Sequence, residues 1–270
     1  MGTPFITFLG PSNLAAYDSS KRSSEQADTI PKTFLDAMEV REQVFVDEQK
    51  VPLQNEFDSN DHRSCHWVIY ASINTLTDPE VKDQSGNIIT RKRSTTRTTP
   101  IGTIRLVPFP HPPHPEPGSK YTFDSTQPSI STDSNQSSYI NDRPTTHHDG
   151  KEPYIKLGRL ALLPEFRGSG IAKMLVSAAT SWMAQNPTYF NPSILEKGIE
   201  RIVGEQGTGT GIGEVPVWKG LVCAHAQEQL VEVWRKWGFS LDEGMGRWEE
   251  EGIGHVGMFL RIDLENRSAS

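Results

Sequence analysis

The feature that most constrains the fold is an apolar stretch at residues 160–163 that enters a turn, after which a second apolar stretch begins at Ile171. The turn reads Arg167-Gly168-Ser169-Gly170, and its small residues let the main chain approach a ligand closely. Free N–H groups and the dipole at a helix start favour an anion. A strand–turn–helix unit with a phosphate or pyrophosphate site is one interpretation, and an ordinary connection with glycines for tight packing is the other.

This unit differs from the two best-known nucleotide-binding loops. The P-loop pattern GxxxxGK[ST] is absent, and the turn lacks the GxGxxG register of the Rossmann fingerprint. A second glycine-rich run, residues 204–213, is followed by no helical pattern and contains no Lys-Ser or Lys-Thr pair. We therefore expect that run to be a flexible loop.

Hydrophobic periodicity places further elements on both sides of this unit. We expect strands at residues 4–9, 66–73, 101–107, 154–162, 220–226 and 255–262, and helices at 31–49, 171–183 and 227–237. Residues 75–99, 108–152 and 186–219 lack such patterns and are rich in Pro, Gly, Ser and Thr. We interpret these three segments as flexible insertions into one domain spanning residues 1–270; a linker between two domains is the alternative.

Composition argues against several classes of protein: nucleic-acid-binding, membrane-spanning, disulfide-rich and zinc-binding. A formal charge of −7 with 27 Lys+Arg argues against a broad nucleic-acid surface, and no apolar run approaches the ~20 residues of a membrane helix. Cys65 and Cys223 cannot form a disulfide framework, and the adjacent pair His147-His148 lies in polar sequence without zinc spacing, so we expect no metal. The first residues lack the basic region of a signal peptide. A cytoplasmic protein is the expectation, with the nucleus as the alternative and with no nucleic-acid or membrane partner.

The turn resembles the acetyl-CoA motif of the GNAT (GCN5-related) N-acetyltransferases. Arg167-x-x-Gly170-x-Ala172 is similar to that family's [Q/R]-x-x-G-x-[G/A] pattern. Segments 41–52 (REQVFVDEQKVP), 101–105 (IGTIR), 225–227 (HAQ), 237–239 (WGF) and 252–256 (GIGHV) resemble, in order, the family's ElaA/YjcF-like branch. The resemblance implies an α/β GNAT fold: a mixed central sheet splayed at the acetyl-CoA strand, helices on both faces and long loop insertions.

The resemblance also implies a set of acetyl-CoA-binding residues. Main-chain amides of the turn would hold the CoA diphosphate, the strand before it would pair with the pantetheine arm, and one strand amide would stabilise the oxyanion. An indole at position 234 would line the acyl tunnel. The residues assigned in this way are Leu160, Ala161, Leu162, Arg167, Gly168, Ser169, Gly170, Ile171, Ala172 and Trp234.

Attack by an amine requires a base that takes its proton. His225 on its predicted strand is the first candidate, with a half-buried structural histidine as the alternative. Glu56 and Asp58, with Asp61 close by, are the next candidates, with a solvated acidic turn as the alternative. His255 in the closing hairpin ranks below His225.

Three further positions bear on the chemistry. Trp234 occupies the position where many family members place a tyrosine acid, and an indole cannot deliver a proton at useful pH. Arg105 and Arg159 lie within strands. We expect outward-facing charges there, and pairing with a nearby carboxylate is the alternative.

These observations predict direct transfer of an acetyl group from acetyl-CoA to a primary amine, with a polyamine or an amino sugar as the favoured acceptor. One alternative is a protein or peptide N-acetyltransferase. Another is a degenerate acyl-CoA-binding module, which the tryptophan at position 234 supports. Many relatives pair as homodimers, and the resemblance leaves that state open here.

Overall fold

The structure is a computed structural model that describes residues 3–78, 81–82, 88–90, 93–121, 142–191 and 217–264. The strands of its main sheet are β1 (Phe5–Leu9), β2 (Cys65–Asp78), β5 (Arg93–Val107), β6 (Lys120–Tyr121), β7 (Ile155–Leu162), β8 (Leu221–Gln227), β9 (Ser240–Leu241), β10 (Arg247–Glu250) and β11 (Ile253–Arg261). The α-helices are α1 (Lys32–Arg41), α2 (Ile171–Gln185) and α4 (Val231–Arg235), and a π-helical stretch, Glu42–Glu48, continues α1. Short 3-10 turns lie at Ser23–Glu25, Leu53–Asn55, Asp61–Arg63, Pro164–Phe166, Glu228–Leu230 and Glu243–Met245.

In the described residues the sheet is mixed and its strand order is β1-β2-β5-β7-β8-β11-β10-β6, with β9 paired to β11. The β7–β8 and β6–β10 pairs are parallel, and the other neighbours are antiparallel. This topology confirms the mixed α/β fold that the sequence predicted.

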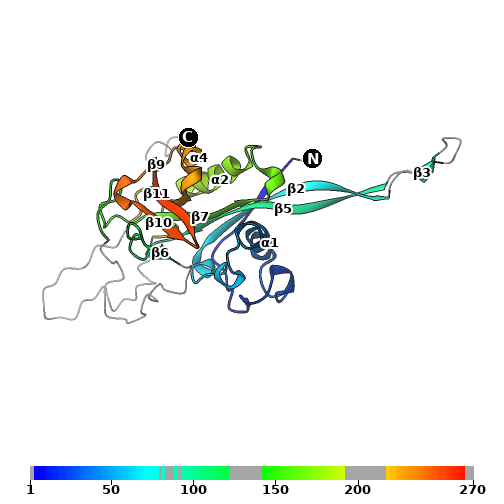
Figure 1. Cartoon of the computed structure of the whole chain (residues 1–270), viewed down its shortest axis with the longest axis horizontal. Helices are drawn as coiled ribbons and strands as arrows, with labels where there is room; N and C mark the ends of the chain where they lie inside the picture. Colours follow the sequence, from blue (N-terminus) through cyan, green and yellow to red (C-terminus); the bar gives the residue numbers. More distant parts are fainter. Residues whose placement is uncertain are drawn as a thin grey trace.

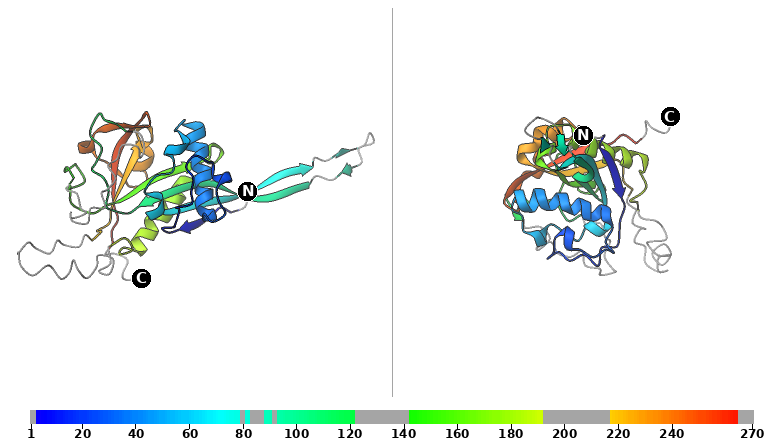
Figure 2. Two further views of the ribbon diagram at one scale, coloured as in Figure 1. Left: turned by 90° about the horizontal axis from the view of Figure 1, so that it is seen from below. Right: turned by 90° about the vertical axis from the view of Figure 1, so that its right-hand side faces the viewer.

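Helices cover both faces of the sheet. Figures 1 and 2 show α1 and α2 on opposite sides of it. Ile171, Leu175, Ala179 and Met183 recur every four residues on α2, and all four are buried because one face of the helix packs against the sheet. The hydrophobic core therefore lies between the helices and the strands that carry the turn.

The described residues of the 75–99 segment form strands. β2 and β5 stay paired from Cys65 and Leu106 out to Asp78 and Arg93, beyond which β3 (Val81–Lys82) pairs with β4 (Ile88–Thr90). The resulting hairpin extends well away from the body of the molecule (Figure 1). Sequence periodicity missed it because the segment has no regular alternation of apolar residues, although its many threonines favour extended structure.

The described ends of the 108–152 segment are held against the sheet. Buried Asp242 accepts hydrogen bonds from Thr145 Oγ1 and from the amides of Thr146 and His147, and β6 pairs with β10. The described ends of this segment, which we expected to be part of a flexible insertion, are thus held by hydrogen bonds and by buried side chains such as Phe109. Residues 122–141, and the glycine-rich run at 204–213, lie outside the described residues.

Among the helices that the structure describes, none combines the length and the apolar character needed to cross a membrane.

Candidate active site

The sheet splays between β7 and β8. The two strands pair only from Ile155 and Val222 to Leu157 and Ala224, although both continue beyond that point. The cause is a bulge in β7: Arg159 has a φ of +49°, and the register against β5 shifts there. A bulge strengthens the local twist and leaves main-chain groups unpaired. The splay predicted at this strand is therefore present, and it exposes one edge of β7.

A cavity of about 750 Å³ occupies the splay. Residues of β7 beyond Leu157 line one wall, and residues of β8 from His225 onward line the other. Of the ten predicted CoA-binding residues, those in contact with this cavity are Leu160, Ala161, Leu162, Arg167, Gly168, Ala172 and Trp234. Ser169 and Gly170 lie in the exposed turn, and the buried Ile171 packs in the core.

The turn at the start of α2 presents free main-chain amides. Gly168 and Gly170 have φ values of +74° and +85°, a conformation that glycine adopts at little cost. The first bond into the helix runs from the Met174 amide to Gly170 O, at 3.2 Å. The Arg167 amide instead donates to Pro164 O, at 3.2 Å. The available amides therefore begin at Gly168, and the inclusion of the Arg167 amide in the predicted cradle is corrected.

The Arg167 side chain fixes this turn in place. Its guanidinium donates to both carboxylate oxygens of Glu48, at 2.8 and 2.5 Å, and to Leu162 O, at 3.1 Å. These hydrogen bonds lower the pKa of Glu48 below its ordinary value. They tie the end of β7 and the turn to the π-helical stretch that follows α1.

His225 stands in the cavity wall with a carboxylate behind it. Its Nδ1 lies 2.8 Å from Glu250 Oε1, and the Trp248 indole donates to the same oxygen at 2.8 Å. Because an ionised carboxylate only accepts, Nδ1 carries the proton and Nε2 keeps its lone pair. Burial, reinforced by Lys156, lowers the pKa of His225 to about 4, so the ring is neutral at physiological pH. Burial opposes ionisation of Glu250, yet His225 and Lys156 hold its pKa well below the ordinary value.

His255 also lines the cavity, from β11, which pairs with β8 on the side away from β7. Its Nδ1 donates to Ile253 O at 2.8 Å, which again leaves Nε2 for a ligand. No carboxylate is among its hydrogen-bond partners in the described residues. His225 therefore has the more complete arrangement of a base.

Glu56 and Asp58 do not reach the cavity. Both are buried, with exposed fractions of 2% and 1%, and their oxygens are bonded to arginines. Burial would raise the pKa of Asp58, but Arg105 and Arg159 hold it below its ordinary value. Paired and enclosed carboxylates cannot collect a proton from a substrate, so the prediction of these two residues as bases is replaced by a structural role.

The arginines of this cluster come from three elements. Arg41 from α1 contacts Glu56 and Asp61, and Arg105 from β5 contacts Asp58 and Asp61, each at 2.6–2.8 Å. Arg159 at the bulge contacts Glu56 at 3.0 Å and Asp58 at 3.1 Å. The expectation that Arg105 and Arg159 face outward is wrong, because a loop that sequence periodicity does not place brings three carboxylates beneath both strands.

Two cationic side chains that sequence reasoning did not single out also line the cavity. Arg63 donates to Asn60 Oδ1 and Pro110 O, and Lys156 projects from β7. His111 lines the same cavity; burial lowers its pKa well below the ordinary value, and Arg63 and Lys156 lower it further. In the described part of the chain, neither Arg63 nor Lys156 forms an ion pair with a carboxylate. Lys156 was detectable as one of two charges in an otherwise apolar strand, whereas Arg63 carried no signal.

Trp234 is buried against Trp237 and Phe239 and also contacts the cavity. It therefore forms part of the apolar wall near the helix that follows β8.

A sequence model of the acetyltransferase (GNAT) family matches residues 43–191, more than half of the chain. The chain belongs to this family. Its members are acyltransferases that use an acyl-CoA donor and an acceptor substrate, and the matched residues include the α1 continuation, β7 and the turn.

Solved structures with a similar fold include other acyltransferases. A putative N-acetyltransferase from Lactobacillus plantarum is 16% identical to this chain and has a TM-score of 0.47. The match covers 97% of this chain and 100% of the Lactobacillus protein. Escherichia coli ElaA is 14% identical, with coverage of 96% and 100% and a TM-score of 0.44. An acyl-CoA N-acyltransferase from Pseudomonas aeruginosa is 15% identical, with coverage of 96% and 99% and a TM-score of 0.43. A search of curated proteins finds no match.

Proposed function

We propose that this GNAT protein is an acetyl-CoA-dependent N-acetyltransferase that transfers the acetyl group directly to a primary amine. The observation that carries the proposal is the His225–Glu250 pair in the wall of a cavity opened by the β7–β8 splay. A neutral imidazole held by a carboxylate is a suitable base, and a neighbouring unpaired strand edge supplies amides for a developing oxyanion.

Each part of the site has a step in this reaction. The amides from Gly168 onward and the dipole of α2 would bind the diphosphate of the donor. The β7 edge would hold the pantetheine arm and polarise the thioester carbonyl. As the amine forms its bond to the carbonyl carbon, Nε2 of His225 takes a proton from that nitrogen, and the carbon–sulfur bond then breaks. Trp234 cannot protonate the sulfur, so CoA departs as the thiolate.

The charges around the cavity indicate the class of acceptor. Its lining carboxylates, Glu48 and Glu250, are already bonded to Arg167 and His225. Arg63 and Lys156 remain available for an anion. We therefore propose an amine that also carries a carboxylate or phosphate, such as an anionic amino sugar, in preference to a polyamine, whose cations would lack partners here.

One observation favours a second candidate function. Trp234 replaces the proton-donating residue of many relatives while the CoA-binding turn is intact, as in a module that binds acyl-CoA without turnover.

The test is thiol release from acetyl-CoA on addition of amines from four groups: polyamines, neutral amino sugars, amino sugar phosphates and amino acids. Release with one of the two anionic groups, and weaker release with polyamines, supports the proposal. Release with polyamines alone contradicts the acceptor class. Tight CoA binding with no release from any amine supports the binding module. A separate CoA titration by calorimetry shows that the protein tested is folded.

A further inference from the structure

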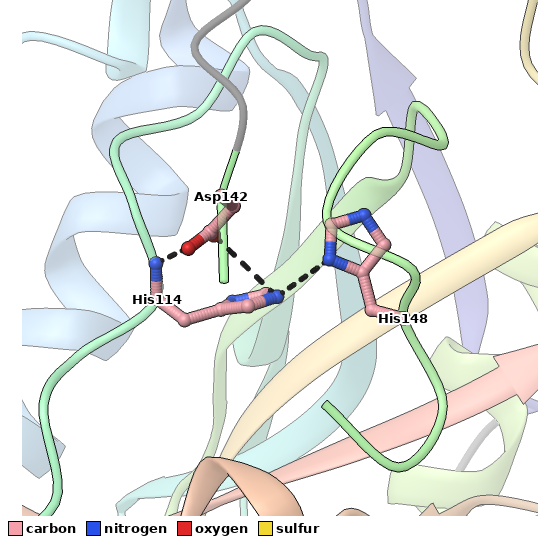
Figure 3. Close-up of side chains that lie close together, drawn as sticks. All are labelled: His114, Asp142 and His148. Carbon is pink, nitrogen blue, oxygen red and sulfur yellow. Dashed lines mark hydrogen bonds and ion pairs between the residues drawn. The ribbon is translucent and has the colours of Figure 1, made fainter. Parts of the chain in front are cut away.

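Three side chains with metal-binding atoms converge beside the cavity, at the described ends of the 108–152 segment. His114 Nε2 lies 2.9 Å from His148 Nδ1 and 3.6 Å from Asp142 Oδ2, and the three ligand atoms all lie within 4.8 Å of one another. Figure 3 shows the two rings and the carboxylate turned toward a common point. When ligand atoms bind one tetrahedral ion at about 2.0–2.2 Å, the distance between two ligand atoms is about 3.3–3.6 Å. Small shifts of these three side chains would therefore let them bind one ion.

The hydrogen bonds around these residues keep the ligand atoms aimed at that point. His148 Nε2 donates to Glu152 O at 2.9 Å, so the Nδ1 lone pair faces the cluster and accepts a hydrogen bond from His114 Nε2. A cation bound there would take the place of that Nε2 proton. Asp142 accepts from the amides of His114 and Arg143, both at 2.7 Å. Metal-binding histidines and carboxylates in proteins are typically oriented by partners of this kind.

Burial and charge also suit a divalent cation. The exposed fractions of His114 and His148 are 3% and 5%, and their rings pack against Tyr154 and Phe259. The set also contains one carboxylate, Asp142, beside the two imidazoles.

We propose that His114, Asp142 and His148 form a binding site for a zinc-like divalent cation. Two imidazoles and one carboxylate match the borderline preference of Zn²⁺, whereas Mg²⁺ and Ca²⁺ prefer all-oxygen sites. His114 and Asp142 are 28 positions apart, so the ion joins two distant pieces of chain. Because Pro112, Pro113 and His114 line the cavity, the bound ion fixes the wall beside Lys156.

This inference revises the expectation that the protein holds no metal. That expectation depended on short Cys/His spacings, and the present ligands come together only through the fold. The site is independent of the proposed reaction, because its ligands do not include His225 or the residues of the CoA-binding turn.

The test uses the full chain, stripped with a chelator and titrated with ZnCl₂ by calorimetry. We expect binding of one equivalent by the wild type, loss of that binding in His148→Ala and Asp142→Asn, and retention in His147→Ala. The adjacent His147 is exposed and makes the last variant a matched control. Titration with CoCl₂ should give the visible absorption of tetrahedral Co²⁺ in the wild type and His147→Ala only.

CoA affinity and near-UV circular dichroism establish that each protein is folded. If His148→Ala does not fold, the near-isosteric Asp142→Asn decides the outcome. The proposal is overturned if folded wild type binds no Zn²⁺, if a folded ligand variant binds it as well as the wild type, or if Mg²⁺ binds as tightly as Zn²⁺.

Discussion

At the scale of single residues, the Glu250 carboxylate decides which nitrogen of His225 is available for chemistry. It accepts from Nδ1 at 2.8 Å and is itself held by the Trp248 indole at 2.8 Å. An amide in its place could donate to Nδ1, which would move the ring proton to Nε2 and abolish the base. The same carboxylate raises the pKa of His225 against burial and Lys156.

We therefore predict that Glu250→Gln lowers kcat/KM for amine acetylation by about 100-fold or more, within the usual contribution of a positioned base. Glu250→Asp should recover part of the loss, and CoA affinity should stay near the wild-type value in both. His225→Gln should show a similar loss, and His62→Gln, at an exposed position, should show none. The pH profile of kcat/KM is the decisive measurement: a wild-type profile retained in both Glu250→Gln and His225→Gln would exclude this pair as the base.

The turn glycines offer a second test at residue scale. A Cβ at Gly170 would meet no protein atom within 4 Å, so an alanine there would strain the turn through its φ of +85° without clashing with other residues. Gly118 has a similar φ of +78° and equally open surroundings, in a different loop. An alanine at either position would have an unfavourable positive φ, but only Gly170 lies in the turn at the start of α2.

Gly170→Ala is expected to weaken CoA binding by about tenfold, the effect of losing one hydrogen bond to a charged group. Gly118→Ala should leave the Kd for CoA unchanged. It should lower the free energy of unfolding by about as much as Gly170→Ala does. Calorimetric titration with CoA measures the first effect and urea unfolding the second. Equal CoA affinity in the two variants would place the diphosphate elsewhere.

At the scale of secondary-structure elements, the arginine–carboxylate cluster joins α1, β5 and β7 beneath the bulge. Arg105 and Arg159 share Asp58, so one carboxylate fastens two strands. Breaking a buried ion pair by removing one partner leaves an uncompensated charge and costs about 3–5 kcal/mol.

Asp58→Asn should therefore lower the free energy of unfolding by about 3–5 kcal/mol, whereas Glu232→Gln, at an exposed ion pair on α4, should change it little. Both substitutions replace a carboxylate with an amide of the same shape. Urea unfolding of the two variants provides the comparison. Equal effects would mean that the cluster contributes no more than a surface ion pair.

The elements also explain how much the sequence could predict. β7, the turn and α2 were predictable because their apolar periodicity and glycines are local signals. Glu250 was not, since the run Glu249-Glu250-Glu251 resembles a solvated charge cluster. It reaches His225 only because β10 pairs with β11 and β11 pairs with β8. Arg105 faces inward for a similar reason, because its carboxylate partners lie 44 and 47 positions away in the chain. Contacts at such separations leave no spacing rule in the sequence.

At the scale of the whole molecule, buried ionisable groups give stability a predictable dependence on pH. His66 and His225 each have a pKa of about 4 in the folded protein, lowered from 6.5 chiefly by burial. Below pH 6.5 the unfolded chain binds a proton on each histidine and the folded chain does not, until about pH 4. Stability is therefore lost as pH falls through this window. The pKa values of Asp58 and Asp61 are also lowered, by their arginines against burial, and their contribution is lost further below pH 3.8.

We expect His66 and His225 each to lower the free energy of unfolding by about 1.4 kcal/mol per pH unit between pH 6.5 and about 4, and His111 and His114, whose pKa values burial also lowers, to add to this slope. Urea unfolding at about pH 7.5, 6 and 5, with a chelator present, measures this slope. His66→Gln should reduce the slope whatever its effect on the stability at neutral pH. The double variant His62→Gln/His147→Gln should keep it, because both of these side chains lie exposed at the surface. A free energy that stays constant between pH 7.5 and 5 would show that the buried rings accept protons without unfolding.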